Sequence, residues 1–281
     1  MKKYINENFP NERDLYGVNE VYLKKCSFDG VEDGESALKE ATNVTCESCY
    51  MNLRYPLWHD KNVVLSGVTM TDKCRAALWY CENVKITKSK LLGIKALREC
   101  FDVTITDSEI VSPEFGWKTS RTKITNSRAE SEYFFFMASS VALDNVSFKG
   151  KYSFQYVKDA VIENCFLDTK DAFWHTENVT VKNCTVKGEY LAWYSKNLTL
   201  INCKIIGTQP LCYCEGLKLI NCETENTDLS FEYSDVQADI KGEIMSIKNP
   251  KSGKIVCDGV GEYIFTKDSK HKCECELEIR K

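Results

Sequence analysis

Hydrophobic and polar residues alternate along most of the chain in short runs that are separated by polar turns. In the segment 178–184, for example, Val179 and Val181 alternate with Thr180 and Lys182. A period of two predicts β-strands, because successive side chains of a strand point to opposite faces. Strands this short, repeated throughout the sequence, exclude a solenoid that is built from helices.

The same seven-residue pattern recurs at a fixed interval. Its copies begin at positions 83, 102, 121, 140, 159, 178, 197, 216 and 235, each nineteen residues after the one before. Earlier copies begin at positions 20, 43 and 62. Two further short segments follow each copy, so that one repeat contains three strands and three turns. This is the composition of one coil of a β-helix, in which every coil stacks on the next.

We therefore expect an all-β fold, a single-stranded, right-handed parallel β-helix of about twelve coils of nineteen residues with capped ends. The right hand follows from the strong preference of parallel crossover connections. Residues 1–281 are expected to form a single domain, with coils over residues 20–239. Residues 1–19 and 240–281 are expected to cap the ends, because an open coil invites edge-to-edge association.

Stacked coils place recurring sequence positions in columns. Asparagines align at the first turn, where they tolerate a left-handed backbone and can hydrogen-bond along the stack: Asn145, Asn164, Asn183, Asn202 and Asn221. Cysteines align beside them inside the predicted core: Cys165, Cys184, Cys203 and Cys222. We expect both columns to stabilise the fold, and we assign them no function.

The third segment of each repeat contains two columns that packing alone does not explain. One holds all five tryptophans of the protein: Lys39, Trp58, Trp79, Arg98, Trp117, Phe136, Gln155, Trp174, Trp193, Cys212 and Phe231. Its neighbour is largely polar and aromatic: Glu40, His59, Tyr80, Glu99, Lys118, Met137, Tyr156, His175, Tyr194, Tyr213 and Glu232. If the apolar column that precedes them points inward, alternation sends the tryptophans outward. A slip of one residue would bury them instead, and the sequence leaves both registers open.

Outward aromatic rows would offer flat apolar faces to sugar rings, and cations beside them could hold a carboxylate or a phosphate. The predicted substrate-binding residues come from both columns: Lys39, Glu40, Trp58, Trp79, Arg98, Trp117, Tyr156, Trp174, His175, Trp193 and Tyr194. Three residues are predicted as catalytic: His59, Glu99 and Lys118. A base beside a cation suits the removal of a proton next to a carboxylate. A small oligosaccharide or a sugar nucleotide is the expected partner.

Composition narrows the choice of partners. The net charge is −4 and the basic residues are scattered, which argues against nucleic acid. No apolar stretch is long enough to span a bilayer, and the N-terminal residues do not resemble a signal peptide, so a cytoplasmic location is expected. The 15 cysteines are then expected to be reduced core thiols, because most of them recur at one repeat position. We expect neither a metal nor a cofactor.

Several third-segment strings resemble an uncharacterised bacterial family, domain of unknown function 3737. They include Arg54–His59, Cys74–Trp79, Ala96–Cys100, Ser112–Trp117 and Asp171–His175. The resemblance extends over nearly the whole chain, from about residue 12 to residue 261. It implies a pectate-lyase-like right-handed β-helix and a bacterial cytosolic origin, but no activity and no catalytic residue.

Three interpretations of the third segment remain open at this stage. The first is carbohydrate binding or processing on the aromatic face, and the sequence leaves open whether the protein is an enzyme. The second is a non-catalytic interaction scaffold that docks a protein partner or a second copy of the chain, since contiguous apolar surface usually marks an interface. The third is a purely structural role for all of these residues.

Overall fold

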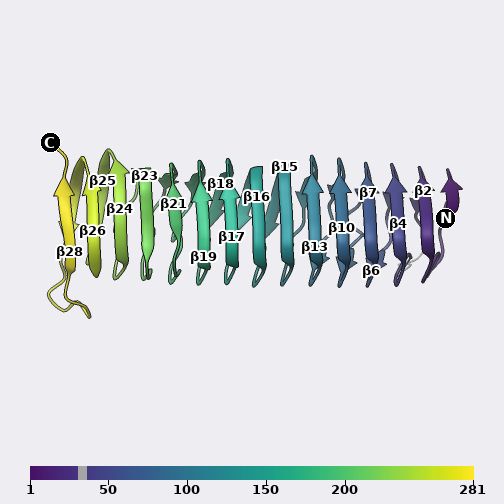
Figure 1. Ribbon diagram of the computed structural model, residues 1–281, viewed down its shortest axis with the longest axis horizontal. Coiled ribbons are helices and arrows are strands. Elements are labelled where there is room, and N and C mark those ends of the chain that lie inside the picture. Colours follow the sequence, from purple (N-terminus) through teal and green to yellow (C-terminus); the bar gives the residue numbers. More distant parts are fainter. Residues whose placement is uncertain (31–36) are drawn as a thin grey trace. The chain divides into compact units, whose positions relative to one another are not determined.

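The computed structural model describes residues 1–30 and 37–281, and within them the fold is all-β. They form a parallel β-solenoid of about 14 turns that contains no helix (Figure 1). The predicted fold class is confirmed. By its internal contacts the chain divides into two compact units, Met1–Ala142 and Leu143–Lys281. The single domain expected for residues 1–281 stays a prediction.

The first unit is built from three sets of parallel strands. The first set is β1 (Lys2–Ile5), β2 (Asn19–Lys24), β4 (Thr42–Glu47), β7 (Lys61–Ser66), β10 (Glu82–Thr87), β13 (Phe101–Thr106) and β15 (Ser120–Glu132). The second set is β3 (Ser27–Phe28), β5 (Tyr50–Met51), β8 (Thr69–Met70), β11 (Lys90–Leu91) and β14 (Glu109–Val111). The third set is β6 (Leu57–Trp58), β9 (Leu78–Trp79) and β12 (Leu97–Arg98). In Figure 1 the strands of the first set lie side by side in sequence order.

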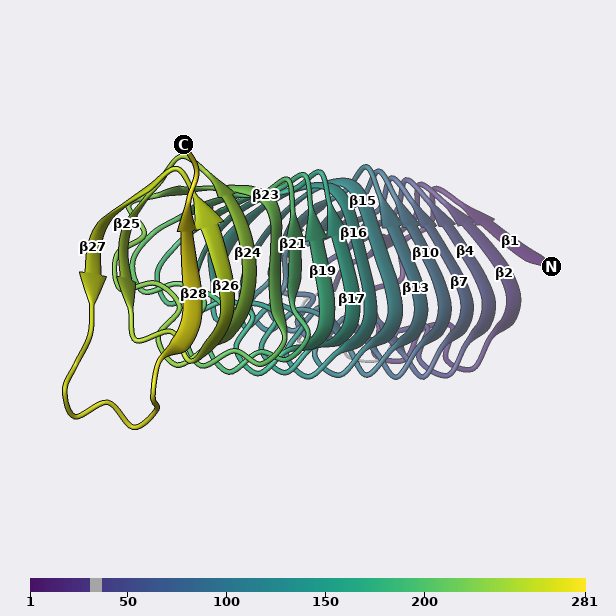
Figure 2. The ribbon, with the colours of Figure 1, turned by 60° about the vertical axis from the view of Figure 1, so that its left-hand side comes forward.

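The second unit repeats this arrangement. The chain enters it within β16 (Ser139–Lys151). The first set continues with β17 (Lys158–Glu163), β19 (Glu177–Lys182), β21 (Thr199–Ile201), β23 (Leu217–Glu225), β24 (Asp235–Lys241), β26 (Ser252–Cys257) and β28 (Glu274–Ile279). Further strands complete the coils: β18 (Phe166–Lys170), β20 (Thr185–Lys187), β22 (Lys204–Ile206), β25 (Glu243–Lys248) and β27 (Gly259–Ile264). Figure 2 shows β25 and β27 beside each other, away from β26 and β28.

Strand pairing follows the predicted step of nineteen residues through most of the chain. Glu82 of β10, for example, pairs with Phe101 of β13. The rungs also extend into the segments that were predicted as caps, because Lys2 pairs with Val21. At the other end the step changes to seventeen and then twenty-two residues, as Asp235 pairs with Ser252 and Ser252 with Glu274. These added rungs explain why there are more turns than the twelve that the regular repeat predicts.

The core consists of the inward column of each strand set. Val63, Val84 and Val103 lie in one such column and are at most 1% exposed. The apolar column of the third segment also points inward, as expected, since Leu57 and Leu78 are fully buried. All 15 cysteines are free thiols, and 13 of them are buried. Free cysteine packs as a small hydrophobic residue, so these thiols belong to the core.

The turns need a left-handed backbone, which the sequence supplies in two ways. At the first turn the φ angles of Asn164, Asn183 and Asn202 are 55°, 53° and 52°. Asparagine is among the residues that tolerate this region. At the third turn bulky residues adopt it too, as φ is 60° at His59 and 61° at Tyr194. Bulky side chains are disfavoured there, and contacts between successive rungs must offset the cost.

Candidate functional site

The five tryptophans of the third segment are half-buried, which is intermediate between the two registers that the sequence left open. In the first unit Trp58 and Trp79 stack with ring centroids 5.1 Å apart and planes 5° from parallel. The guanidinium of Arg98 lies 4.9 Å from the centroid of Trp79 and 5.6 Å from that of Trp117. The Lys39 ammonium lies 5.1 Å from the Trp58 ring. Neighbouring rings and cations therefore cover the faces of the indole rings along the column.

The indole N–H groups of this column are also occupied. Each donates a hydrogen bond to a backbone carbonyl of the next rung: Trp58 to Ala76, Trp79 to Lys95, Trp117 to Tyr133, Trp174 to Tyr190 and Trp193 to Gln209, at 2.6 to 2.9 Å. Trp174 and Trp193 of the second unit stack at 5.4 Å and 4°. Since faces and N–H groups are both engaged, the tryptophans present mainly ring edges to solvent.

The three residues predicted as catalytic lie on different rungs of the first unit. Glu99 accepts a hydrogen bond from its own neighbour, with 3.2 Å between Arg98 Nε and Glu99 Oε1. His59 stacks obliquely on Tyr80, with centroids 4.9 Å apart. Lys118 and Glu40 are exposed turn residues. No hydrogen bond or ion pair among the described residues joins His59, Glu99 and Lys118, and their catalytic role stays a prediction.

The neighbouring column forms an exposed ladder of stacked rings in the second unit. Tyr156 and His175 stack at 4.8 Å and 8°, His175 and Tyr194 at 5.0 Å and 7°, and Tyr194 and Tyr213 at 4.7 Å and 11°. We call these four residues the ring ladder. Each ring covers its neighbours' faces, so the ladder presents edges, phenol hydroxyls and imidazole nitrogens to solvent. Of the predicted binding residues, the structure thus brings Tyr156, His175 and Tyr194 together.

The ladder ends at Tyr233, where the stacking breaks down. The Tyr233 ring is tilted by 50° against Tyr213, at a centroid distance of 5.8 Å, and His271 meets it edge-on at 5.3 Å. A cavity of about 530 Å³ opens here. It is lined by Tyr194, Tyr213, Cys214, Glu215, Tyr233, Lys251, Lys270 and His271. We call it the tyrosine cavity. The parallel stacking of rings along the ladder ends at this cavity.

The tyrosine cavity carries an excess of positive charge. Neither Lys251 nor Lys270 forms an ion pair within the part of the chain that the structure describes, whereas Glu215 is held by Lys196 at 3.2 Å. Burial raises the pKa of Tyr213 to about 12, and the nearby Glu232 carboxylate adds to the effect. The Tyr213 phenol therefore stays neutral and can donate a hydrogen bond. An anion with hydroxyl groups and an apolar face matches these walls.

The sequence identified only part of this cavity. Between Tyr213 and Tyr233 the step is twenty residues, so a column counted in nineteens reaches Glu232 instead of Tyr233. Lys251, Lys270 and His271 follow the last regular repeat and belong to no column. The recurrence of tyrosine at one position of the repeat was the available signal in the sequence. The change of step concealed the other cavity residues.

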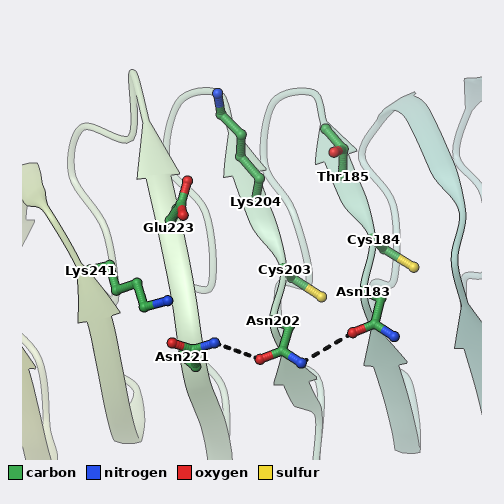
Figure 3. A pocket seen from close by; sticks show the side chains of 9 residues that line it. All are labelled: Asn183, Cys184, Thr185, Asn202, Cys203, Lys204, Asn221, Glu223 and Lys241. Atoms are coloured by element: carbon green, nitrogen blue, oxygen red, sulfur yellow. Dashed lines mark hydrogen bonds between the residues drawn. The ribbon is translucent and has the colours of Figure 1, made fainter.

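A second hollow of the same unit lies at the end of the asparagine column (Figure 3). Its volume is about 320 Å³, and amide, ammonium and carboxylate groups line it. In residues 1–30 and 37–281, no three His, Cys, Asp or Glu side chains are grouped in a way that suits a metal ion. The same residues include no helix that could cross a membrane.

Comparison with known protein families shows to which family the chain belongs. The profile of one family, described as protein of unknown function (DUF3737), matches residues 2–278. The chain belongs to this family. The resemblance seen in the third-segment strings is thereby confirmed for DUF3737 over nearly its full length. Comparison with curated proteins gave no match.

Solved structures similar to this DUF3737 chain are β-helix proteins of low sequence identity. The surface adhesin PfbA of Streptococcus pneumoniae is 10% identical, with 92% of this chain and 91% of that one covered and a TM-score of 0.46. The A-module of mannuronan C-5 epimerase AlgE4 from Azotobacter vinelandii is 9% identical, with 84% and 87% covered and a TM-score of 0.35. The lacto-N-biosidase of Eubacterium ramulus is 9% identical, with 94% and 63% covered and a TM-score of 0.36. Likeness at this level concerns the fold alone.

Proposed function

We propose that the tyrosine cavity binds an acidic carbohydrate, either a short uronate oligosaccharide or a sugar nucleotide. The observation that carries this proposal is that a tilted tyrosine ring and two lysines, Lys251 and Lys270, which form no ion pair with any described residue, line one cavity. A carboxylate or phosphate of the ligand would form ion pairs with the two lysines, and the sugar ring would pack against the face of a tyrosine ring. Small-ligand sites commonly combine an apolar wall with a few polar groups that fix orientation.

Ring geometry favours this cavity over the rest of the aromatic surface. In the ring ladder and in the pair Trp174–Trp193, ring faces are covered by the next rung at 4.7 to 5.4 Å. Trp117 and Phe136 are also tilted, by 47°, but Arg98 lies on the Trp117 ring. A sugar ring needs an uncovered face for apolar contact. The tilt of 50° between Tyr213 and Tyr233 uncovers such a face. The predicted residues Tyr156 and His175 would then contribute only through their edges, on rungs beyond the cavity.

Charge favours an acidic ligand over a neutral one. The only carboxylate among the residues that line the cavity, Glu215, is already paired with Lys196. Lys251 and Lys270 are thus available to an anionic group, and hydrogen bonds between ions are about twice as strong as neutral ones. The neutral Tyr213 phenol supplies a further donor.

The test is a thermal-shift titration of the full chain with trigalacturonate and UDP-glucuronate, using maltotriose as the neutral control. A ligand at a hundredfold its dissociation constant stabilises by about 2.7 kcal/mol, which is easily measured. We expect an acidic ligand to stabilise the protein and the neutral one to have no effect. Added salt should weaken the binding, because it screens the lysines.

Variants locate the site. Tyr233→Ala and the double change Lys251→Met with Lys270→Met should each weaken binding by about tenfold or more, since each removes contacts worth over 1 kcal/mol. Lys272→Met is the matched control, because Lys272 lies in the same segment, pairs with Glu274 at 3.9 Å and does not line the cavity. Stabilisation that survives the cavity changes, or that is equal for maltotriose, would contradict the proposal.

A further inference from the structure

The asparagine column of the second unit is a directed chain of hydrogen bonds. The Nδ2 group of each residue donates to the Oδ1 atom one rung earlier: Asn183 to Asn164 at 3.3 Å, Asn202 to Asn183 at 3.1 Å and Asn221 to Asn202 at 2.6 Å. Figure 3 shows the last two of these bonds. All amide dipoles point the same way, so the chain ends with a carbonyl acceptor at Asn221. Aligned hydrogen bonds polarise one another, which strengthens this last acceptor.

The chain stops at Asn221 because the next strand is shorter at this turn. Leu219 pairs with Ala238 and Cys222 with Ile240, so two residues of β23 face a single residue of β24. β24 therefore lacks the position at which the next asparagine of the column would stand. Asn221 Oδ1 consequently accepts no hydrogen bond from any residue in 1–30 or 37–281.

The vacant position opens into the second hollow, about 320 Å³ in volume. On the far side lies Lys241, whose ammonium Figure 3 shows directed toward Asn221. Lys241 forms no ion pair with a described residue, and no hydrogen bond joins it to Asn221. Lys204, Glu223 and Lys241 occupy the same position of three successive rungs. Figure 3 shows the Lys241 ammonium on the side of Asn221 and the Lys204 ammonium directed away from it.

These groups define the chemistry of a ligand. A ligand group that enters the hollow between Asn221 and Lys241 would have to donate a hydrogen bond to a carbonyl on one side and accept one from an ammonium on the other. A primary carboxamide does both, whereas a carboxylate has no proton to donate. The α-ammonium of an amino acid would meet Glu223, whereas Lys204 is already paired with Glu225 at 2.7 Å.

We propose that this hollow binds a free amino acid with a side-chain carboxamide, glutamine or asparagine, whose amide occupies the missing rung of the asparagine column. The site is separate from the tyrosine cavity and shares no lining residue with it. Its volume suits a ligand of this size, at the lower end of the range for small-molecule sites.

The experiment is equilibrium dialysis of the full chain against radiolabelled L-glutamine and L-asparagine, with L-glutamate and L-aspartate as competitors of the same shape. We expect saturable binding of at least one amide, and competition by the acids that is weaker by about tenfold or more, since the acid leaves the Asn221 acceptor unpaired. Absence of saturable binding, or equal competition by the acids, would overturn the proposal.

Two variants complete the test. Asn221→Gly removes the acceptor but keeps a residue suited to the left-handed backbone, where φ is 55°, and Lys241→Met removes the ammonium. Each should weaken binding by about tenfold. Lys218→Met, an exposed change on the same strand, is the control and should bind as the natural protein does. If Lys241→Met lowers only thermal stability and amide binding is unaffected, Lys241 is a structural cap of the column and the proposal fails.

Discussion

Single residues of the first unit show how strongly burial acts on polar groups in this core. Asp60 follows the turn residue His59 and is fully buried. Its Oδ1 atom accepts a hydrogen bond from the Ala41 amide at 3.0 Å, and its Oδ2 atom has no hydrogen-bond partner among the described residues. Burial raises the pKa of Asp60 to about 9. The residue is therefore a neutral acid at pH 7, because an isolated charge would be costly at this position.

A raised pKa at Asp60 makes stability depend on pH. Between about pH 4, where the unfolded carboxyl titrates, and about pH 9 the folded state binds one more proton than the unfolded state, so stability falls as pH rises. The free energy of unfolding should drop by about 1 kcal/mol or more per pH unit in this range. Asp60→Asn, which is neutral at every pH, should remove this slope. Urea unfolding at pH 6 and pH 8 measures it, with the exposed Asp107→Asn as control. Equal slopes in Asp60→Asn and the natural protein would contradict the assignment.

Arg98, whose predicted role in substrate binding stays a prediction, lies in a stack of aromatic rings. Its guanidinium lies between Trp79 and Trp117. We expect Arg98→Ala to lower the free energy of unfolding by about 1–3 kcal/mol, through two lost cation–π contacts and the lost packing of the side-chain stem. Arg98→Trp should be tolerated better, because indoles already stack on neighbouring rungs. Chemical unfolding followed by tryptophan emission distinguishes the two. If Arg98→Ala is neutral, the stack contributes nothing to stability.

At the scale of the strand and turn, the left-handed turn residues carry the strain of the fold. At Asn183 the backbone φ is 53°, and the side chain makes hydrogen bonds to both neighbouring rungs. Asparagine thus satisfies the turn conformation and the column at once. The third turn meets the same backbone demand with tyrosine and histidine, whose stacked rings replace the amide hydrogen bonds.

Two substitutions at Asn183 separate these contributions. Asn183→Gly loses the amide hydrogen bonds but keeps an easy left-handed backbone, whereas Asn183→Ala loses both. We expect Asn183→Ala to be less stable than Asn183→Gly by about 1 kcal/mol, the cost of the left-handed conformation for a residue with Cβ. Urea unfolding of the two variants gives the difference. If the alanine variant were the more stable one, the turn would not be strained.

The elements also show how far sequence reasoning could reach. The regular step of nineteen residues predicted the strands, the parallel pairing and the inward column of Leu57 and Leu78. It missed the added rung at Lys2, although the step from Lys2 to Val21 is still nineteen residues, and it failed where the step changes, at Ser252 and Tyr233. It could not predict the exposure of the tryptophans either. Alternation along a strand predicts side chains that point either inward or outward, whereas these rings are half-buried. The side chains that line a cavity depend on the lengths of individual turns, and the regular repeat does not predict where those lengths change.

At the scale of the whole molecule, the cysteines report on the integrity of the core. All cysteines except Cys273 and Cys275 are buried, and those two are partly exposed. Burial raises the pKa of Cys275 to about 11, so its reactive thiolate is scarce at neutral pH. Under native conditions a thiol reagent should modify at most two cysteines, with Cys273 reacting first. In denaturant it should modify all fifteen. Mass spectrometry counts the modified sites, and rapid modification of several buried thiols in the native protein would contradict the packing described.

Both hollows of the second unit lie beside the rungs where chain length per turn departs from nineteen. Tyr213 and Tyr233 are twenty residues apart, and Cys222 and its partner Ile240 are eighteen apart. In such a fold, the gain or loss of one residue at a turn leaves the strands paired. It displaces the side chains next to that turn relative to those of the neighbouring rung. New pockets can therefore arise by insertion and deletion rather than by substitution. Among related chains, differences in ligand should then track the lengths of turns more closely than the identity of core residues.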